Sequence, residues 1–118
     1  MMEWSDKMKH KMKLHNGPFE KIKQGTKNVE MRLNDKKRQL IKIGDIIEFE
    51  NRVTFETISV SVVGLVKFNS FTDLYNSFDK MSIGYDADDI ANPCDMEKYY
   101  SKEEQEMYGV LAILIKII

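Results

Sequence analysis

The chain has 118 residues and a mass of 13.8 kDa, which suits one domain with a single hydrophobic core and excludes multi-domain machinery. Hydrophobic residues make up 42% of it and charged residues 31%, with only 2 Pro and 6 Gly, a composition that excludes a disordered or collagen-like chain. The single cysteine, Cys94, cannot form an internal disulfide or a zinc site of the usual thiolate type. The sequence shows neither a membrane helix nor a secretory signal, and we therefore expect a cytoplasmic protein.

The charges are divided unevenly along the chain, although the formal net charge is only -1. Residues 1–42 carry 12 Lys and Arg against 5 Asp and Glu, a net charge of +7, and residues 43–118 carry a net charge of -8. A positive surface is the usual electrostatic footprint of nucleic-acid or nucleotide binding. Two halves of opposite sign can equally neutralise one another inside one domain, so charge alone does not decide the function.

Residues 7–15 alternate between basic positions and apolar or ring-bearing positions, which predicts a half-buried strand. His10 falls on the inward face, where a hydrogen-bonded core histidine is more common than a metal ligand or a base. Asn16 as a cap, with a proline in the turn behind it, predicts a short helix over residues 17–24. Gly25 is expected to end that helix with a positive φ.

Residues 27–33 alternate again and predict a second strand, with Glu30 and Arg32 pointing to the same side of it. Residues 34–42 are polar and basic and suggest a connection rather than a strand. A Gly-Asp turn signal follows them, and residues 46–50 then predict a third strand.

The longest predicted strand covers residues 56–68. Five of its apolar side chains keep even numbers and so share one face of the strand: Ile58, Val60, Val62, Val66 and Phe68. Gly64 lies in the same series and indicates a β-bulge or a close approach of another backbone.

The second half of the chain holds two predicted helices around a long loop. Ser70 begins the first helix with a capping-box pattern. Residues 80–99 lose periodicity and accumulate Asp, Gly and an Asn-Pro pair, which predicts a long ordered loop of the kind that often carries function. A second capping box at Ser101 begins a short helix that Gly109 ends, and residues 110–118 predict a buried last strand.

Strands at both ends and in the middle of the chain, with short helices between them, do not give the regular alternation of a parallel doubly wound sheet. We predict an α+β fold instead, a small and partly closed β-barrel of about five to six mixed strands with short helices inserted. Residues 1–118 form one domain in this interpretation, and residues 1–6 form a loose N-terminal extension.

Strong catalytic and metal-binding motifs are absent from the sequence. It contains no glycine-rich phosphate loop, no HExxH motif and no cluster of Cys and His ligands, so neither a metal nor a cofactor is expected. Cys94 lies among acidic residues, which disfavour a reactive thiolate. What remains is a segment behind the first predicted helix that places Lys27, Glu30 and Arg32 on one strand.

Three patterns in order along the chain carry a family resemblance. They are Gly-x-Lys-x-x-Glu-x-Arg at residues 25–32, a Gly-Asp pair before a strand at residues 44–45, and Tyr-Gly-Val at residues 108–110. In this order they resemble the ASCH domain, the activating signal cointegrator homology family, over almost the whole chain, and its small stand-alone prokaryotic members in particular. The resemblance implies a PUA-like β-barrel, relatives of which bind RNA.

The resemblance also implies a ligand cleft lined by Lys27, Glu30 and Arg32. An arginine can grip a phosphate or carboxylate with two hydrogen bonds, a glutamate can accept from a base amine, and a lysine supplies a mobile positive charge. Arg38 is expected to extend the basic rim, and Tyr100 to stack on a base. The ordinary alternatives are an ion network for the first three residues and a hydrophobic staple for Tyr100.

Three functions are compatible with these residues. The first is a module that binds RNA or a nucleoside-type ligand. The second is a hydrolase acting on an acylated nucleoside or on RNA, because one bacterial branch of the family hydrolyses the acetyl amide of acetylcytidine with a threonine nucleophile, the motif lysine and a distant glutamate. Glu30 occupies the threonine position here, so Lys27 and Glu30 would have to act as the catalytic pair, with Glu30 as a general base. The third is a protein-interaction domain in transcription-related regulation.

Overall fold

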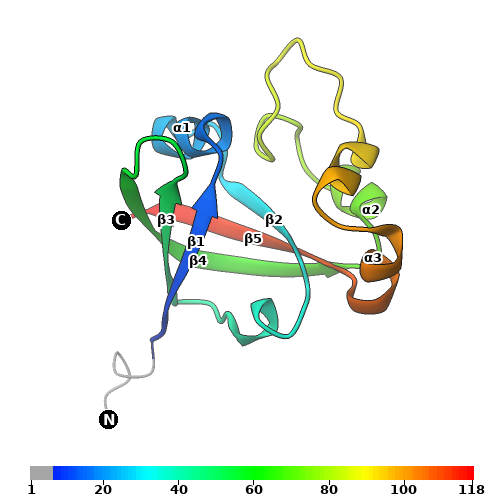
Figure 1. Cartoon of the computed structure of the whole chain (residues 1–118), viewed down its shortest axis with the longest axis horizontal. Coiled ribbons are helices and arrows are strands. Elements are labelled where there is room, and N and C mark those ends of the chain that lie inside the picture. The colour runs from blue at the N-terminus through cyan, green and yellow to red at the C-terminus, as the bar shows by residue number, and fades with distance from the viewer. Residues whose placement is uncertain (1–6) are drawn as a thin grey trace.

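The computed structural model describes residues 7–118, so the extension predicted at residues 1–6 lies outside the described residues. The strands are β1 (Lys9–Leu14), β2 (Val29–Leu33), β3 (Ile46–Asn51), β4 (Thr57–Phe68) and β5 (Val110–Ile117). They form one sheet in the order β1-β3-β4-β5-β2, with a parallel β1–β3 pair and antiparallel pairs elsewhere. β1 and β2 are therefore the two edge strands (Figure 1).

The sheet curls into a half-barrel, and the gap between its two edge strands is called the seam below (Figure 1). One hydrogen bond bridges the seam, because the Nη2 group of Arg32 on β2 donates to the carbonyl oxygen of Lys13 on β1 at 3.2 Å. The predicted α+β fold with a partly closed, mixed β-barrel is thereby confirmed.

Short helices flank the half-barrel. α1 (Asn16–Gln24) connects β1 to β2, and the 3-10 turn η2 (Arg38–Leu40) lies between β2 and β3. The remaining helical elements, α2 (Phe71–Tyr75), η3 (Pro93–Lys98) and α3 (Lys102–Tyr108), all lie between β4 and β5 in the chain. Figure 1 shows α2 and α3 gathered beyond β2, on the side of the molecule away from β1. No helix within residues 7–118 is long and apolar enough to cross a membrane.

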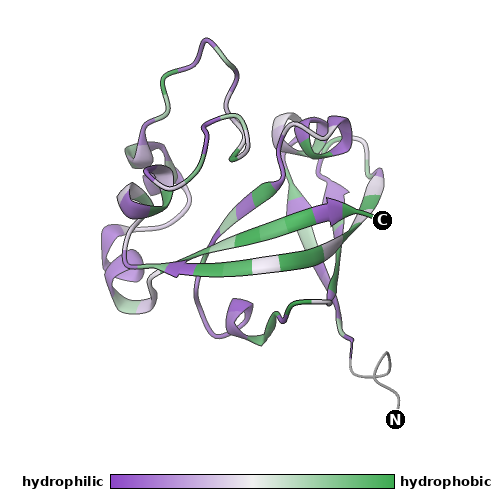
Figure 2. Cartoon of the chain, turned by 180° about the vertical axis from the view of Figure 1, so that it is seen from behind, coloured by the Kyte–Doolittle hydropathy of each residue, from purple (hydrophilic) through white to green (hydrophobic). Residues whose placement is uncertain are grey.

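Two hydrophobic cores lie on opposite faces of β5. The first core contains Phe19 of α1 and lies inside the half-barrel. The second contains Phe71 of α2 and Met96 of η3. Successive side chains of a strand point to opposite faces, and accordingly the odd-numbered residues of 111–115 enter the first core and the even-numbered residues of 110–114 the second. This double burial explains the continuous apolar stretch of β5 seen in Figure 2.

His10 has the core role that the sequence predicted. Its Nε2 atom lies 2.9 Å from Oδ2 of Asp45, and both side chains are largely buried. The Asp45 carboxylate also accepts from the backbone N–H groups of Met8 and Lys42. These bonds fix the start of β1 against the turn that precedes β3.

The start of α1 differs from the prediction, because Asn16 does not cap it. His15 is the N-cap residue and makes no capping bond with its side chain, whereas Asn16 Oδ1 accepts a 2.9 Å hydrogen bond from Nδ2 of the fully buried Asn51. Asn51 Oδ1 in turn accepts from the N–H of Val53 at 2.8 Å and so shapes the β3–β4 turn. The helix end is as predicted, since Gly25 has a φ of 89°.

β4 contains the predicted irregularity at Gly64, where its register against β5 shifts after Val62. The shift exchanges the two faces of the strand beyond it, so Leu65 packs against the first core and Val66 is 38% exposed. The prediction that Val66 shares a face with Val60 and Val62 is wrong, because the inserted residue reverses the alternation and the prediction carried the same parity through the bulge.

Candidate functional site

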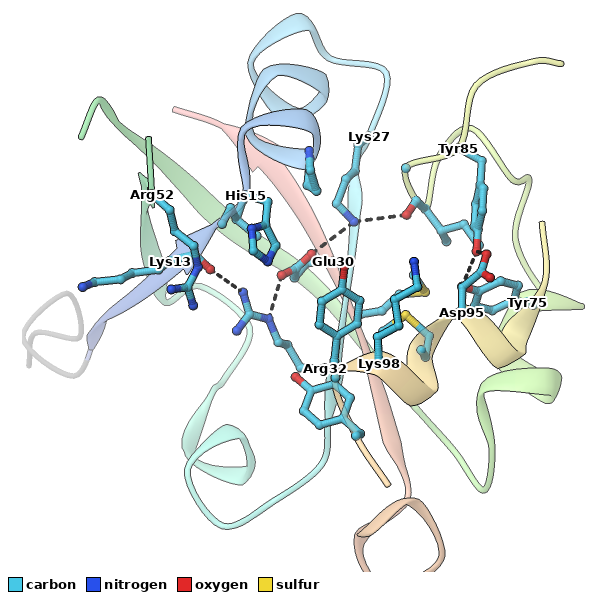
Figure 3. A pocket seen from close by; sticks show the side chains of 18 residues that line it. Lys13, His15, Lys27, Glu30, Arg32, Arg52, Tyr75, Tyr85, Asp95 and Lys98 are labelled. Atoms are coloured by element: carbon cyan, nitrogen blue, oxygen red, sulfur yellow. Dashed lines mark hydrogen bonds and ion pairs between the residues drawn. The ribbon is translucent and has the colours of Figure 1, made fainter. Parts of the chain in front are cut away.

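Lys27, Glu30 and Arg32 meet in one buried ion network beside the seam. The Lys27 Nζ atom lies 3.1 Å from Glu30 Oε1, and the Arg32 Nε group donates to Glu30 Oε2 at 2.7 Å. Their side chains are only 4%, 5% and 14% exposed, respectively. Figure 3 shows the Glu30 carboxylate between the other two charged groups. The structure therefore brings together all three residues of the predicted cleft.

Lys27 precedes β2 and does not lie on it, because the strand begins at Val29 and not at the predicted residue 27. Its ammonium group donates to the carbonyl oxygens of Val29 at 2.8 Å and Ile83 at 3.2 Å, besides its contact with Glu30. An ammonium group has three N–H donors, and these three contacts use all of them. Lys27 thus connects β2 to the loop at Ile83 and keeps no donor for a ligand.

Gly84 allows this loop to pass close over Lys27. It has a φ of 113°, and a Cβ atom at this position would lie 3.2 Å from the Lys27 Cδ atom. Lys21 of α1 donates to the Gly84 carbonyl oxygen at 2.8 Å, and the Ser82 carbonyl oxygen accepts from the N–H of Val29 at 3.0 Å. These bonds hold the loop against α1 and β2 as one side of the site.

The network is charged and strongly coupled. Burial by itself raises the pKa of the Glu30 carboxyl, but the charges of Lys27 and then Arg32 outweigh it and keep that pKa below its usual value. Burial likewise opposes the charge on Arg32, and Glu30, followed by Tyr100, outweighs it and raises the pKa of Arg32. A carboxylate with a lowered pKa and both oxygens occupied is a weak general base.

A pocket of about 580 Å³ opens beside the network. Besides Lys27, whose donors are all engaged, its cationic lining consists of Lys13 on β1, Arg32 on β2, Arg52 in the β3–β4 turn and Lys98 on η3. Figure 3 shows Lys13 and Arg52 together on one side of it. Arg52 is exposed and forms no ion pair within the described part of the chain. The pocket therefore has a cationic side with charge available to an anion.

A second hollow of about 410 Å³ adjoins the pocket, because Lys13, Arg32 and Arg52 line both. Arg38 lies in this hollow and not in the pocket, and it forms an ion pair with Asp35 at 2.9 Å. The other charged residues of the hollow are Lys11, Lys37, Glu48 and Glu50. The pocket and the hollow together are called the seam groove below, and positive residues outnumber negative ones along it.

Tyr100 lines the pocket, but Phe71 covers one face of its ring, with ring centroids 6.1 Å apart and planes inclined by 15°. A hydrophobic staple is not formed, because its partner position in α3 is Gln105, whose Nε2 group donates to the Tyr100 carbonyl oxygen at 3.1 Å. Tyr99 and His15 also line the pocket, and their rings lie 6.2 Å apart.

A hydrogen-bonded chain of Tyr75, Tyr85 and Asp95 forms another side of the pocket, away from Lys13 and Arg52 (Figure 3). The two tyrosine hydroxyls lie 2.8 Å apart, and the Tyr85 hydroxyl donates to Asp95 Oδ2 at 2.7 Å. This group is called the tyrosine–aspartate chain below.

Sequence reasoning missed much of the pocket lining. Tyr85 and Asp95 lie in the 80–99 loop, which the sequence marked as functional without indicating which residues face a ligand. Lys13 is one of the alternating basic positions of residues 7–15 and has no further signal, and the position of Arg52 depends on a turn that the buried Asn51 shapes.

Asp86, Asp88 and Asp89 bring carboxylate oxygens within 4.8 Å of one another, but all three residues are exposed. Asp86 pairs with Lys21 at 3.2 Å, and Asp89 Oδ2 accepts from the Asp86 N–H at 2.8 Å. These bonds account for the grouping as part of the loop structure.

The five-stranded half-barrel with a polar site at its seam defines a PUA-like domain. The family description of the ASCH domain matches residues 12–118, and the chain therefore belongs to the ASCH-domain family. No curated protein matches the chain at a significant level.

Solved structures agree with this assignment. The crystal structure of hypothetical protein PH0355 is 32% identical to this chain, with a TM-score of 0.80, and the match covers 94% of this chain and 100% of that one. The solution NMR structure of protein PF0455 from Pyrococcus furiosus is 30% identical, with a TM-score of 0.74 and coverage of 94% and 98%. The crystal structure of ASCH from Zymomonas mobilis is 16% identical, with a TM-score of 0.68 and coverage of 94% and 68%, and shares the fold.

Proposed function

We propose that this protein binds a nucleotide, free or as an unpaired nucleotide of RNA, in the pocket beside the seam. The phosphate lies against Lys13, Arg32 and Arg52, and the base lies among the tyrosines. Arg32 is oriented before any ligand arrives, because Glu30 and the Lys13 carbonyl oxygen hold its Nε and Nη2 groups. Such preorganisation lowers the entropic cost of gripping an anion.

The observation that carries the proposal is the overlap between the pocket and the second hollow. A site for a small molecule needs one concave pocket, whereas a bound RNA also needs cations along the phosphates that flank the recognised nucleotide. The seam groove continues from the pocket past Arg52 to Arg38 and Lys37. Its extent favours RNA over a free nucleotide as the source of the ligand.

The contacts of Lys27 and Glu30 disfavour the hydrolase alternative. Every Lys27 donor is engaged by protein oxygens, and both Glu30 oxygens are engaged by cations. A general base needs a free lone pair beside the attacking water and a pKa close to the working pH. We therefore assign both residues to the support of the binding site rather than to proton transfer.

Two further parts of the proposal concern the surroundings of the protein. The exposed thiol of Cys94 is free, which suits the reducing cytoplasm. A protein partner has a less specific basis, because the exposed apolar side chains belong to separate elements, such as Phe55 in the β3–β4 turn, Ile90 in the loop and Met107 in α3.

The test measures the affinity for a short single-stranded RNA by fluorescence anisotropy over a range of salt concentrations. The variant is Arg52→Gln, and the matched control is Lys116→Gln, which removes an exposed charge outside both hollows. We expect Arg52→Gln to weaken RNA binding about tenfold and to reduce the salt slope by about one. Lys116→Gln should leave both quantities unchanged.

Mononucleotides form a second arm that separates the two sources of the ligand. Mononucleotide affinity equal to RNA affinity would identify a free nucleotide as the ligand, whereas tighter RNA binding supports the extended groove. Equal losses in the Arg52 and Lys116 variants, or no binding of RNA and mononucleotides alike, would contradict the proposal. Release of an acyl group from acylated nucleosides, detected by mass spectrometry and abolished by Lys27→Ala, would instead establish the hydrolase.

A further inference from the structure

The proton positions in the tyrosine–aspartate chain follow from its distances. The Tyr85 hydroxyl lies 2.7 Å from Asp95 Oδ2, 2.8 Å from the Tyr75 hydroxyl and 3.3 Å from the Asn92 carbonyl oxygen. A carboxylate and a carbonyl oxygen can only accept, so the single Tyr85 proton is directed to one of them, and the shorter distance favours Asp95. No Tyr85 proton is left for Tyr75, and Tyr75 must therefore donate to Tyr85.

Both hydroxyls keep their protons near neutral pH. Burial, followed by the hydrogen bonds with Tyr75 and Asp95, raises the pKa of Tyr85 well above its usual value. Burial also raises the pKa of Tyr75. The tyrosine–aspartate chain thus runs in one direction, from Tyr75 through Tyr85 to the Asp95 carboxylate. Both hydroxyl protons are directed along it toward Asp95.

The tyrosine–aspartate chain consequently offers only acceptors to the pocket. The Tyr75 oxygen donates its proton to Tyr85 and keeps its own lone pairs. Oδ1 of Asp95 has no hydrogen-bond partner within residues 7–118. Lys98 also reaches into the pocket (Figure 3), but it forms no ion pair with Asp95 in the described part of the chain.

The charges of the pocket are therefore segregated, except for Lys98, which comes from η3 together with Asp95. Lys13, Arg32 and Arg52 line a cationic side, and the tyrosine–aspartate chain lines another side with acceptors. A complementary ligand carries an anion at one end and hydrogen-bond donors at the other. A nucleotide has this arrangement when its base presents an amino group.

We infer that the pocket selects nucleotides whose base carries an exocyclic amino group, such as adenine or cytosine, over their oxo counterparts. The amino group donates to Asp95 Oδ1, whereas a carbonyl oxygen at the same place meets the lone pairs of Asp95 and Tyr75 and is repelled. The N3–H donor of uracil does not escape this repulsion, because it lies between two carbonyl oxygens. The inference rests on the proposed function and names its class of ligand.

The test uses two pairs of ligands in which an oxo group replaces the amino group and the adjacent ring nitrogen gains a proton, CMP with UMP and AMP with IMP. Dissociation constants are measured by titration calorimetry, and the CMP–UMP comparison is repeated with short oligo-C and oligo-U RNA. We expect the amino member of each pair to bind about tenfold more tightly or better, which is the effect of one hydrogen bond to a charged acceptor. Equal affinities within each pair overturn the inference but leave nucleotide binding itself standing.

Variants locate the discrimination. Asp95→Asn should abolish the amino preference, because its amide can turn either an oxygen or an NH₂ group toward the base. Asp88→Asn removes an exposed carboxylate outside the pocket and should keep the full preference. Tyr75→Phe removes one acceptor without changing the charge, and it should reduce the amino preference less than Asp95→Asn does. An undiminished preference in both Asp95→Asn and Tyr75→Phe overturns the inference, and failure of every nucleotide and RNA to bind overturns the proposed function together with it.

Discussion

The ion network and the tyrosine–aspartate chain differ in how completely their polar groups are satisfied. In the network, Lys27 and Glu30 bond only to protein atoms, and both are at least 95% buried. In the tyrosine–aspartate chain, Asp95 keeps one carboxylate oxygen without a partner within residues 7–118, and Tyr75 keeps free lone pairs. The comparison shows that Lys27 and Glu30, two residues of the family pattern, are satisfied by the protein itself, whereas Asp95 and Tyr75 keep acceptors without a partner in the described residues.

The same acid-to-amide substitution in the two regions should give the largest contrast. Glu30→Gln leaves Lys27 and Arg32 buried without a counter-charge, and we expect it to lower the free energy of unfolding by about 3–5 kcal/mol. Asp95→Asn leaves the partly exposed Tyr85 hydroxyl with a neutral acceptor, and the expected loss is about 1 kcal/mol. Urea denaturation of both variants and the wild type measures the two values. Equal losses of unfolding free energy in the two variants would contradict this expectation.

Low pH should reduce the difference in unfolding free energy between the wild type and Glu30→Gln. The folded protein holds the pKa of Glu30 below the ordinary value of 4.5, so the carboxylate stabilises the fold above that pH and loses this contribution as the pH falls through the folded pKa. We expect the gap in unfolding free energy to be constant above pH 5 and to narrow steadily below pH 4.5. A gap that stays the same down to pH 3 would show that Glu30 does not stabilise the fold through its charge.

A smaller effect is expected where the loop contacts the network. Gly84→Ala places a methyl group 3.2 Å from the Lys27 side chain at a φ that alanine tolerates poorly, with an expected cost of about 1–3 kcal/mol. Gly17→Ala is the control, because no atom lies within 4 Å of the added methyl group. Hydrogen exchange should accelerate at the N–H of Val29, whose acceptor is the Ser82 carbonyl oxygen, in the first variant only. Unchanged hydrogen exchange of the Val29 N–H in Gly84→Ala would show that the loop and the ion network are not coupled.

The sequence patterns predicted the framework of the fold better than its open surface. Alternation placed Glu30 and Arg32 on one face of a strand, and the positive φ of Gly25 followed from its place behind a helix. Both features are set by neighbours in the chain. The exposed position of Val66 was beyond such reasoning, because one inserted residue, Val63, reverses every position after it.

The candidate site depends on contacts that no local pattern contains. The last donor of Lys27 is engaged because a carbonyl oxygen at Ile83, 56 residues further along the chain, reaches it. Arg52 and Asp95 enter the same pocket from a hairpin turn and a 3-10 turn that are far apart in the chain. Their juxtaposition follows from the curl of the sheet. The spacing of these residues in the sequence does not reveal that they lie close together.

The pairing of β2 with β5 also determines when the site can form during synthesis. Glu30 and Arg32 lie opposite Ile113 and Leu111, in the last strand of the described chain. A growing polypeptide that has not yet emerged from the ribosome as far as β5 has no sheet edge on which β2 can be placed, and such long-range pairings form late. The topology thereby makes formation of the site dependent on the synthesis of β5.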